Sequence, residues 1–224
     1  MKLLPFLPFL LLTHAVLAQS SVAQFAIWRP KDGTTASFEK GYQQHLLWHK
    51  THGDTWSWYG WFISSGPRLG QFVDASFDHA WSDFDHPVDP AGDGADNQLH
   101  VYPFGEIQTV FKTVLIKSLS TGDSRSLQSK FIRLITLQVT DINSGIQVLE
   151  QFKRSYQPLQ HFLVYKLADG GSLNQLMIMW GFSTFEDYGK SEALQEALYK
   201  AGTTIRSITS ETLVYRANMS LFPQ

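Results

Sequence analysis

Short runs of hydrophobic and polar residues predict alternating strands and helices over most of this chain. A period of two is typical of a half-buried strand, and a period near 3.6 is typical of an amphipathic helix. The expected strands cover residues 22–28, 56–64, 71–77, 106–117, 131–140, 160–167, 175–182 and 208–217. The expected helices cover residues 35–51, 78–85, 142–156 and 184–200, the second of them short.

The same order of elements occurs twice along the chain. Residues 59–66, an apolar strand followed by a turn, lie 104 positions before the similar residues 163–170. The same offset places residues 81–84 over residues 185–188, where an aromatic and acidic pair opens a helix in each case. A fixed offset of this kind indicates an internal repeat.

Each copy has the order β-α-β-β-α-β, which is the ferredoxin-like plan. We therefore predict an α+β fold with two tandem ferredoxin-like repeats, at residues 22–117 and 131–217, joined by a polar linker at 118–130. Both helices of such a unit cover one face of its sheet, so the other face needs a partner. We expect the two sheets to pack face to face as an intrachain dimeric α/β barrel.

Residues 86–104 interrupt the symmetry between the two copies. Their prolines and glycines predict an irregular loop where the second copy has a helix. We expect this loop to form a lid or rim over the cleft of the first repeat, with its tip at residues 89–96 exposed. The expected buried anchors are Leu99, Val101, Tyr102 and Phe104.

The N-terminal residues and the composition indicate an exported protein. Residues 1–18 combine Lys2, an apolar run and the small residue Ala18, as a secretory signal peptide does. The run is shorter than the roughly 20 residues that span a bilayer, so no transmembrane span is expected. The chain has no cysteine, which favours a bacterial periplasm or the cell exterior over a eukaryotic disulfide scaffold. The net charge of −2 gives no reason to expect a nucleic-acid partner.

Paired histidines on the first predicted helix are the candidates for chemistry. His45 and His49 are four residues apart, so they share one helix face and could ligate a metal or act as a general base. A third ligand would have to come from His79, Asp83 or Asp85. The alternative is that the histidines favour the negative end of the helix dipole. No His-Glu-x-x-His or cysteine motif is present, so the sequence predicts no metal site.

Tryptophans gather in the first repeat and are absent from the matching strand of the second. This asymmetry places the expected ligand pocket in the first repeat, where aromatic side chains could line an apolar cavity. The alternative is that each tryptophan belongs to the core. The expected ligand-binding residues are His45, His49, Trp61, Arg68, His79 and Trp81, with Arg68 at the pocket mouth.

Two such repeats, each with a hairpin followed by an aromatic and acidic helix start, resemble the dimeric α/β-barrel superfamily. This superfamily includes antibiotic-biosynthesis monooxygenase-like, stress-responsive barrel and NIPSNAP-type domains. The resemblance implies a monomer that is a pseudo-dimer, with a site between one sheet and its two helices. Members range from cofactor-free oxygenases and haem-degrading enzymes to proteins with no known activity, so fold alone does not assign the function.

Three hypotheses for the function follow. The first is an exported protein that binds a small apolar or aromatic molecule in the first-repeat cleft. The second is an oxygenase-like or haem-handling enzyme, in which His45 or His49 is the axial haem ligand or the general base. The third is a structural or partner-binding module, which would show an exposed apolar patch and no pocket.

Overall fold

The computed structural model describes residues 21–223. The expected signal peptide at residues 1–18 lies outside the described residues. No helix in the described part of the chain is long and apolar enough to cross a membrane.

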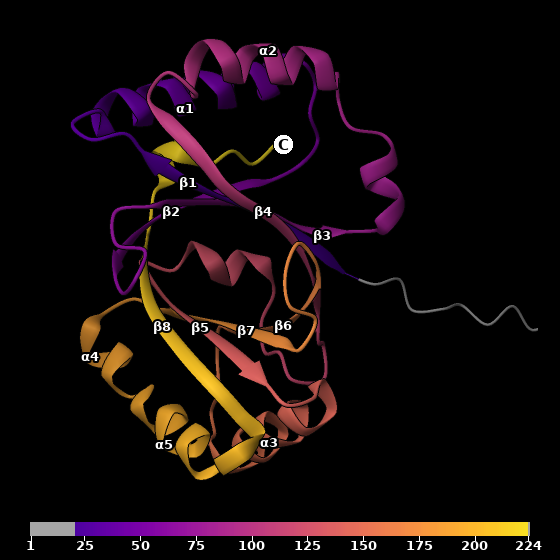
Figure 1. The fold of residues 1–224 in the computed structure, drawn as a ribbon, viewed down its shortest axis with the longest axis vertical. Helices are drawn as coiled ribbons and strands as arrows, with labels where there is room; N and C mark the ends of the chain where they lie inside the picture. Colours follow the sequence, from indigo (N-terminus) through magenta and orange to yellow (C-terminus); the bar gives the residue numbers. More distant parts are fainter. Residues whose placement is uncertain (1–20, 224) are drawn as a thin grey trace, which may run out of the picture.

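A closed antiparallel β-barrel forms the centre of the molecule (Figure 1). Its strands follow the order β1-β3-β2-β8-β5-β7-β6-β4 around the barrel. The strands of the first half are β1 (Val22–Pro30), β2 (Trp58–Ser65), β3 (Phe72–His79) and β4 (Gly105–Leu115). Those of the second half are β5 (Phe131–Val139), β6 (Phe162–Asp169), β7 (Gln175–Phe182) and β8 (Ile205–Tyr215).

Hydrogen bonds between the two halves close the barrel. Strand β2 pairs with β8, and β4 pairs with β6, both antiparallel. The expected barrel is therefore present, and its strands form one continuous sheet that curves back on itself. Closure leaves no unpaired sheet edge, and it encloses one apolar interior.

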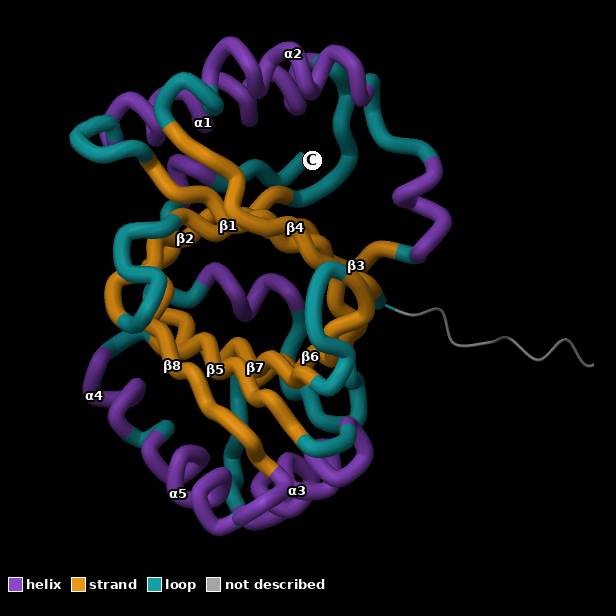
Figure 2. The backbone as a smooth tube through the Cα atoms, in the orientation of Figure 1, coloured by secondary structure: helices purple, strands orange, loops and turns teal. Residues whose placement is uncertain are grey.

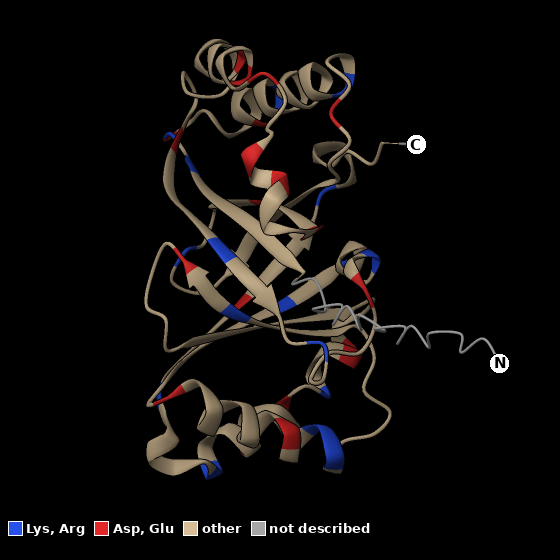
Figure 3. Ribbon diagram, turned by 90° about the vertical axis from the view of Figure 1, so that its right-hand side faces the viewer, with Lys and Arg blue, Asp and Glu red and all other residues tan. Residues whose placement is uncertain are grey.

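Helices cover two opposite sides of the barrel (Figure 2). Helices α1 (Thr35–Thr51) and α2 (Pro90–His100) lie on the first half. Helices α3 (Ile142–Ser155), α4 (Phe185–Gly189) and α5 (Glu192–Lys200) lie on the second. Short 3₁₀ helices occur at η1 (Trp81–Asp85), η2 (Ser124–Gln128), η3 (Gly202–Thr204) and η4 (Ala217–Met219). Lys and Arg are interspersed with Asp and Glu over the ribbon (Figure 3).

Most expected elements are confirmed, and the helices expected at 78–85 and 184–200 differ from expectation. The first is the 3₁₀ helix η1, because β3 extends to His79. The helix at 35–51 is confirmed by α1, and the strand at 175–182 by β7. The helix expected at 184–200 is two helices, because the chain turns between Gly189 and Glu192. That turn buries Ser191, whose hydroxyl donates to the carbonyl oxygen of Tyr188.

Residues 86–104 contain helix α2 instead of the expected irregular loop. Asp89 caps this helix by accepting a hydrogen bond from the Gly92 amide at 3.1 Å, and Pro90 occupies the first turn, where no amide donor is needed. Val101 is fully buried, as expected, whereas Leu99 is 69% exposed. The proline and glycine residues that predicted a loop thus begin a helix.

Buried apolar side chains form three layers inside and around the barrel. One fills the barrel interior, one lies between the first-half strands and α1, and one lies between the second-half strands and helices α3 and α5. The polar linker expected at 118–130 contributes to two of them, because Leu119 and Leu127 are both fully buried. Leu127 packs in the barrel interior, where its carbonyl accepts a hydrogen bond from Trp61 Nε1 at 3.1 Å.

Trp61 is a core residue of the barrel and does not line the cleft beside α1. Successive side chains of a strand point to opposite faces. In β2, Tyr59, Trp61 and Ile63 therefore point into the barrel, while Trp58 and Phe62 face the helices. Trp81, the other tryptophan expected in the cleft, is 46% exposed on η1.

Replacing each of these two tryptophans tests that assignment. Trp61→Ala removes a fully buried side chain, so the free energy of unfolding should fall by about 3–5 kcal/mol. Trp81→Ala changes a partly exposed side chain and should alter it by about 0.5 kcal/mol or less. Urea unfolding followed by circular dichroism measures both. Equal losses in the two variants would contradict the placement of Trp61.

Candidate functional site

Helix α1 presents two buried histidines beside its apolar face. Phe38, Tyr42 and Leu46 pack on the first-half strands at helical spacing. His45 and His49 lie next to this stripe, and each is 6% exposed. Both imidazoles contact Asp93 of α2, and the His49 ring lies 4.7 Å from the ring of Trp58 on β2.

Gly41 allows α2 to approach α1 closely. A Cβ atom at this position would lie 1.8 Å from the carbonyl oxygen of His100, at the C-terminal end of α2. Only the absence of a side chain permits this contact. The close approach places the acidic residues of α2 against the histidines of α1.

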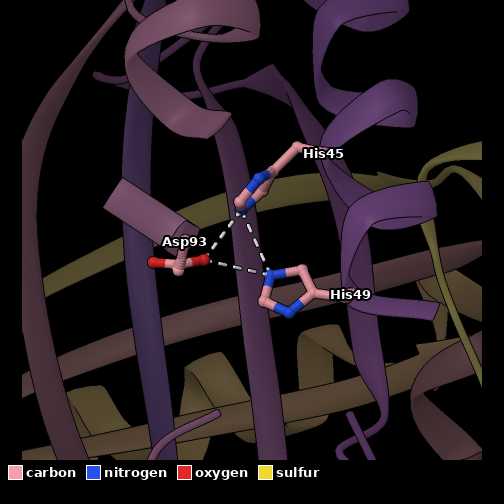
Figure 4. A group of neighbouring side chains, drawn as sticks. All are labelled: His45, His49 and Asp93. Atoms are coloured by element: carbon pink, nitrogen blue, oxygen red, sulfur yellow. Dashed lines mark hydrogen bonds and ion pairs between the residues drawn. The ribbon is translucent and has the colours of Figure 1, made fainter. Parts of the chain in front are cut away.

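His45, His49 and Asp93 converge on one point (Figure 4). The two Nε2 atoms are 3.1 Å apart. Asp93 Oδ1 lies 3.3 Å from His45 Nε2 and 3.5 Å from His49 Nε2. Two nitrogens and one carboxylate oxygen therefore form a nearly regular triangle. The two nitrogens come from α1, and the oxygen comes from α2.

A second carboxylate contacts the other nitrogen of each histidine. His45 Nδ1 lies 2.8 Å from Asp96 Oδ2. His49 Nδ1 lies 2.8 Å from Asp54 Oδ2, although its N–H is not well aligned with that oxygen. Asp54 is itself held by Trp58 Nε1 at 2.9 Å and by the Trp56 amide at 2.9 Å. Such outer carboxylates fix the tautomer and orientation of metal-binding histidines.

These contacts leave both Nε2 atoms as acceptors that face each other. A carboxylate only accepts hydrogen bonds, so Nδ1 carries the hydrogen in each neutral ring and Nε2 carries a lone pair. Asn97 Nδ2 lies 3.0 Å from His45 Nε2 and can satisfy one of these lone pairs. The remaining arrangement, the lone pair of His49 Nε2 beside the anionic Asp93 oxygen, favours a cation or a proton.

The triangle has the dimensions of a metal coordination face. Ligand bonds of about 2.0–2.1 Å place the donor atoms of a tetrahedral zinc roughly 3.3–3.4 Å apart. The same bonds place the donors of an octahedral face roughly 3 Å apart. The observed separations of 3.1, 3.3 and 3.5 Å cover both geometries.

The pKa of His45 reflects the two carboxylates that surround its ring. Burial alone lowers the pKa of His45, but hydrogen bonds and charge from Asp93 and Asp96 outweigh burial and raise it above its usual value. Burial raises the pKa of Asp54, but the close contact with His49 and the hydrogen bonds from Trp56 and Trp58 outweigh this and lower it. Asp54 is thus an ionised acceptor, and a proton on His45 would offset the negative charge of Asp93 and Asp96.

A cavity of about 270 Å³ opens directly beside this cluster. His49 and Asp93 form one wall, and Trp56, Trp58 and Phe84 form much of the rest. Its volume lies just under the range of roughly 300–1,000 Å³ that holds small-molecule ligands. A ligand in this cavity would contact His49 and Asp93 on one side and the aromatic rings of Trp56, Trp58 and Phe84 on another.

The other expected site residues lie apart from the triangle. His79 packs against Trp56 with ring centroids 4.0 Å apart and the rings tilted by 36°, and its Nε2 lies 2.7 Å from Ser76 Oγ. Burial lowers the pKa of His79. Arg68 pairs with the buried Glu211 in the cavity at one end of the barrel interior, so it is not at the mouth of the first-half pocket. The third member of the triangle is Asp93, and none of the expected His79, Asp83 and Asp85 contributes.

Sequence reasoning missed the acidic half of the site. Asp93 and Asp96 are three residues apart, a spacing that places both on one face of a helix. The expectation of an exposed loop concealed this signal, and both side chains face α1 instead. Asp54 gave no signal of its own, because it follows the C-terminal end of α1 in an irregular segment.

Haem does not fit at these histidines. An axial ligand must present a free Nε2 to a flat macrocycle. Here the Nε2 atoms of His45 and His49 are 3.1 Å apart, with Asp93 in contact with both. No space remains between them for a porphyrin.

No family model and no curated protein matches the sequence. Solved structures are similar over nearly the whole chain. One from Lactobacillus acidophilus, described as a "putative monooxygenase", is 10% identical, with a TM-score of 0.61 and coverage of 91% of this chain and 97% of that one. A second "putative monooxygenase", from Fusobacterium nucleatum, is 11% identical, with a TM-score of 0.59 and coverage of 89% and 94%.

A mutant chlorite dismutase from Candidatus Nitrospira defluvii is 9% identical, with a TM-score of 0.60 and coverage of 88% and 92%. At sequence identities this low, the similarity concerns the fold alone. This chain has the dimeric α/β-barrel fold. The barrel order and the helices on two opposite sides agree with that assignment.

Asp74 is a further buried carboxyl beneath α1, and it gives a pH-dependent prediction. It accepts a hydrogen bond from Trp28 Nε1 at 2.8 Å, and burial raises its pKa from 3.8 to about 6. A carboxyl with a raised pKa contributes stability that is complete below 3.8 and is lost as the pH rises to about 6.

Asp74→Asn should therefore become more stable than the wild type as the pH rises from 4 to 6. The gain should reach up to about 3 kcal/mol above pH 6. Urea unfolding of both proteins across this range measures the difference. A constant difference across the range would contradict the raised pKa.

Proposed function

We propose that this protein is an oxygenase-like enzyme that uses a divalent transition-metal ion bound by His45, His49 and Asp93. One observation supports this most directly: two histidine Nε2 atoms and a carboxylate oxygen, spaced like metal ligands, face one point. Two histidines and one carboxylate with open positions are the donor set of non-haem iron(II) oxygenases. A bound ferrous ion supplies redox chemistry with dioxygen.

The protein's own residues define what reaches such a metal. His45 and His49 bind it through Nε2 while Asp96 and Asp54 hold the imidazole rings in place. The aromatic walls at Trp56, Trp58 and Phe84 exclude water and favour a small apolar or aromatic substrate. The half-exposed side of Asp93 faces this cavity, so substrate and metal ligand share one space.

The sequence features add further parts to the proposal. The two halves share an element order, which supports their origin as tandem ferredoxin-like repeats of the NIPSNAP-type or antibiotic-biosynthesis monooxygenase-like kind. Each half would then replace one subunit of a dimer, and the protein would be a monomer. The expected signal peptide supports export to a periplasm or to the cell exterior.

A second candidate function is binding of a small apolar or aromatic molecule without turnover. The cavity beside His49 favours it, since aromatic walls alone suffice for binding. Oxygen uptake separates the two functions. Uptake with a panel of small aromatic compounds after anaerobic loading with Fe²⁺, lost in Asp93→Ala, supports the enzyme. Tryptophan quenching by such compounds without oxygen uptake supports the binding protein.

Calorimetric titration of the metal-free protein with Zn²⁺ or Co²⁺ tests the metal site itself. One ion should bind per chain. His49→Ala removes a ligand and should weaken binding by more than the roughly 10–100-fold loss of an outer-shell change. His52→Ala is the matched control, because His52 is exposed on the same stretch of chain and its Nδ1 contacts the Trp48 carbonyl. Equal losses in both variants, or no binding to the wild type, would refute the site.

Asp96→Asn tests the outer carboxylate, and pH tests the competing proton. Metal binding needs neutral His45, so the apparent affinity should fall as the pH decreases through the raised pKa of His45. Asp96→Asn should weaken binding about 10–100-fold when measured above that pKa, where protonation no longer contributes. An affinity that does not vary with pH would contradict a role for His45 as ligand.

A further inference from the structure

The cleft of the second half contains a buried arginine. Arg133 lies on β5, and its guanidinium contacts Ser191 and Gln195 at α5. Helices α4 and α5 lie on the opposite side of the barrel from α1 and α2 (Figure 1). Arg133 is only 7% exposed. Its guanidinium also lies 5.4 Å from the ring centroid of Tyr188, at the level of α4.

Neutral groups hold this guanidinium in a fixed orientation. Its Nε donates to Ser210 Oγ at 3.1 Å, its Nη1 to Ser191 Oγ at 2.5 Å and its Nη2 to Gln195 Oε1 at 3.1 Å. An arginine has five N–H donors, so two remain, one on each Nη. The side chain is thus preorganised, with two donors left for a further partner.

Arg133 has no carboxylate partner within 4.0 Å in the part of the chain from residue 21 to residue 223. Over the same residues only Arg206 shares this property. The remaining arginines each contact an Asp or Glu: Arg29, Arg68, Arg125, Arg154 and Arg216. A buried charge without a counter-ion costs several kcal/mol, so proteins pair such charges.

Both unpaired arginines line the same cavity. This cavity has a volume of about 370 Å³, within the range for small-molecule sites. Apolar surface comes from Ile135, Leu198, Ile205 and Ile208. The polar groups come from the two arginines and from Gln195, Tyr199, Ser207 and Ser210. The lining therefore matches a molecule with one anionic group and an apolar body.

We propose that this second-half cavity binds a small organic carboxylic acid whose carboxylate pairs with Arg133. The planar guanidinium matches a carboxylate through two parallel hydrogen bonds. Arg206 provides a second positive charge, and the apolar surface accommodates the hydrocarbon part. This site is independent of the metal proposal, because no residue is shared with the cluster on α1 and α2.

Thermal unfolding and calorimetry of the full protein with matched ligand pairs test the proposal. Benzoate, phenylacetate and octanoate are compared with their neutral amides at constant ionic strength. The carboxylates should raise the melting temperature saturably, and the amides should not. Equal effects of acid and amide, or no effect of either, would overturn the proposal. The same stabilisation by sulfate or chloride would also overturn it, because an unselective anion site would not need the apolar lining.

Variants locate the binding. Arg133→Gln should weaken carboxylate binding at least tenfold, and Arg206→Gln should weaken it by less. Arg154→Gln is the matched control, because Arg154 is exposed on α3, and binding should be unchanged. If Arg133→Gln does not fold, Arg133→Lys retains the charge but loses the paired geometry, and it should also weaken binding. Unchanged affinity in the folded Arg133 variant would overturn the assignment.

Discussion

Closure of the barrel is the constraint on which the rest of this structure depends. Each strand has a hydrogen-bonded neighbour on both sides, and the pairings β2–β8 and β4–β6 connect the two halves. The interior is filled by side chains from both halves and by Leu127 from the linker. Because inward and outward positions alternate, closure also decides which side chains remain outside to meet the helices.

The outer layers are alike in architecture and different in chemistry. In the first half, the close contact at Gly41 places acidic residues of α2 over the histidines of α1. In the second half, the break before α5 buries Ser191 against Arg133. One layer therefore gathers anionic and imidazole groups that attract a cation, while the other leaves a guanidinium that attracts an anion.

Buried polar groups connect binding to stability in this protein. His45, His49 and Asp74 are each 6% exposed, and Arg133 is 7% exposed. Such groups cost free energy unless a partner compensates them, and a ligand that binds only the folded state adds its binding energy to stability. The proposed binding sites and the stability of the fold thus involve the same buried residues.

The sequence by itself determined the element types and one half of the candidate site. Periodicity located the eight strands of the barrel and helix α1, and four-residue spacing paired His45 with His49, because both signals are local. Tertiary structure alone decided that Trp61 points inward, that Arg68 meets Glu211, and that Asp93 meets the histidines. Those contacts join residues tens to more than a hundred positions apart, and helix packing and barrel closure set them.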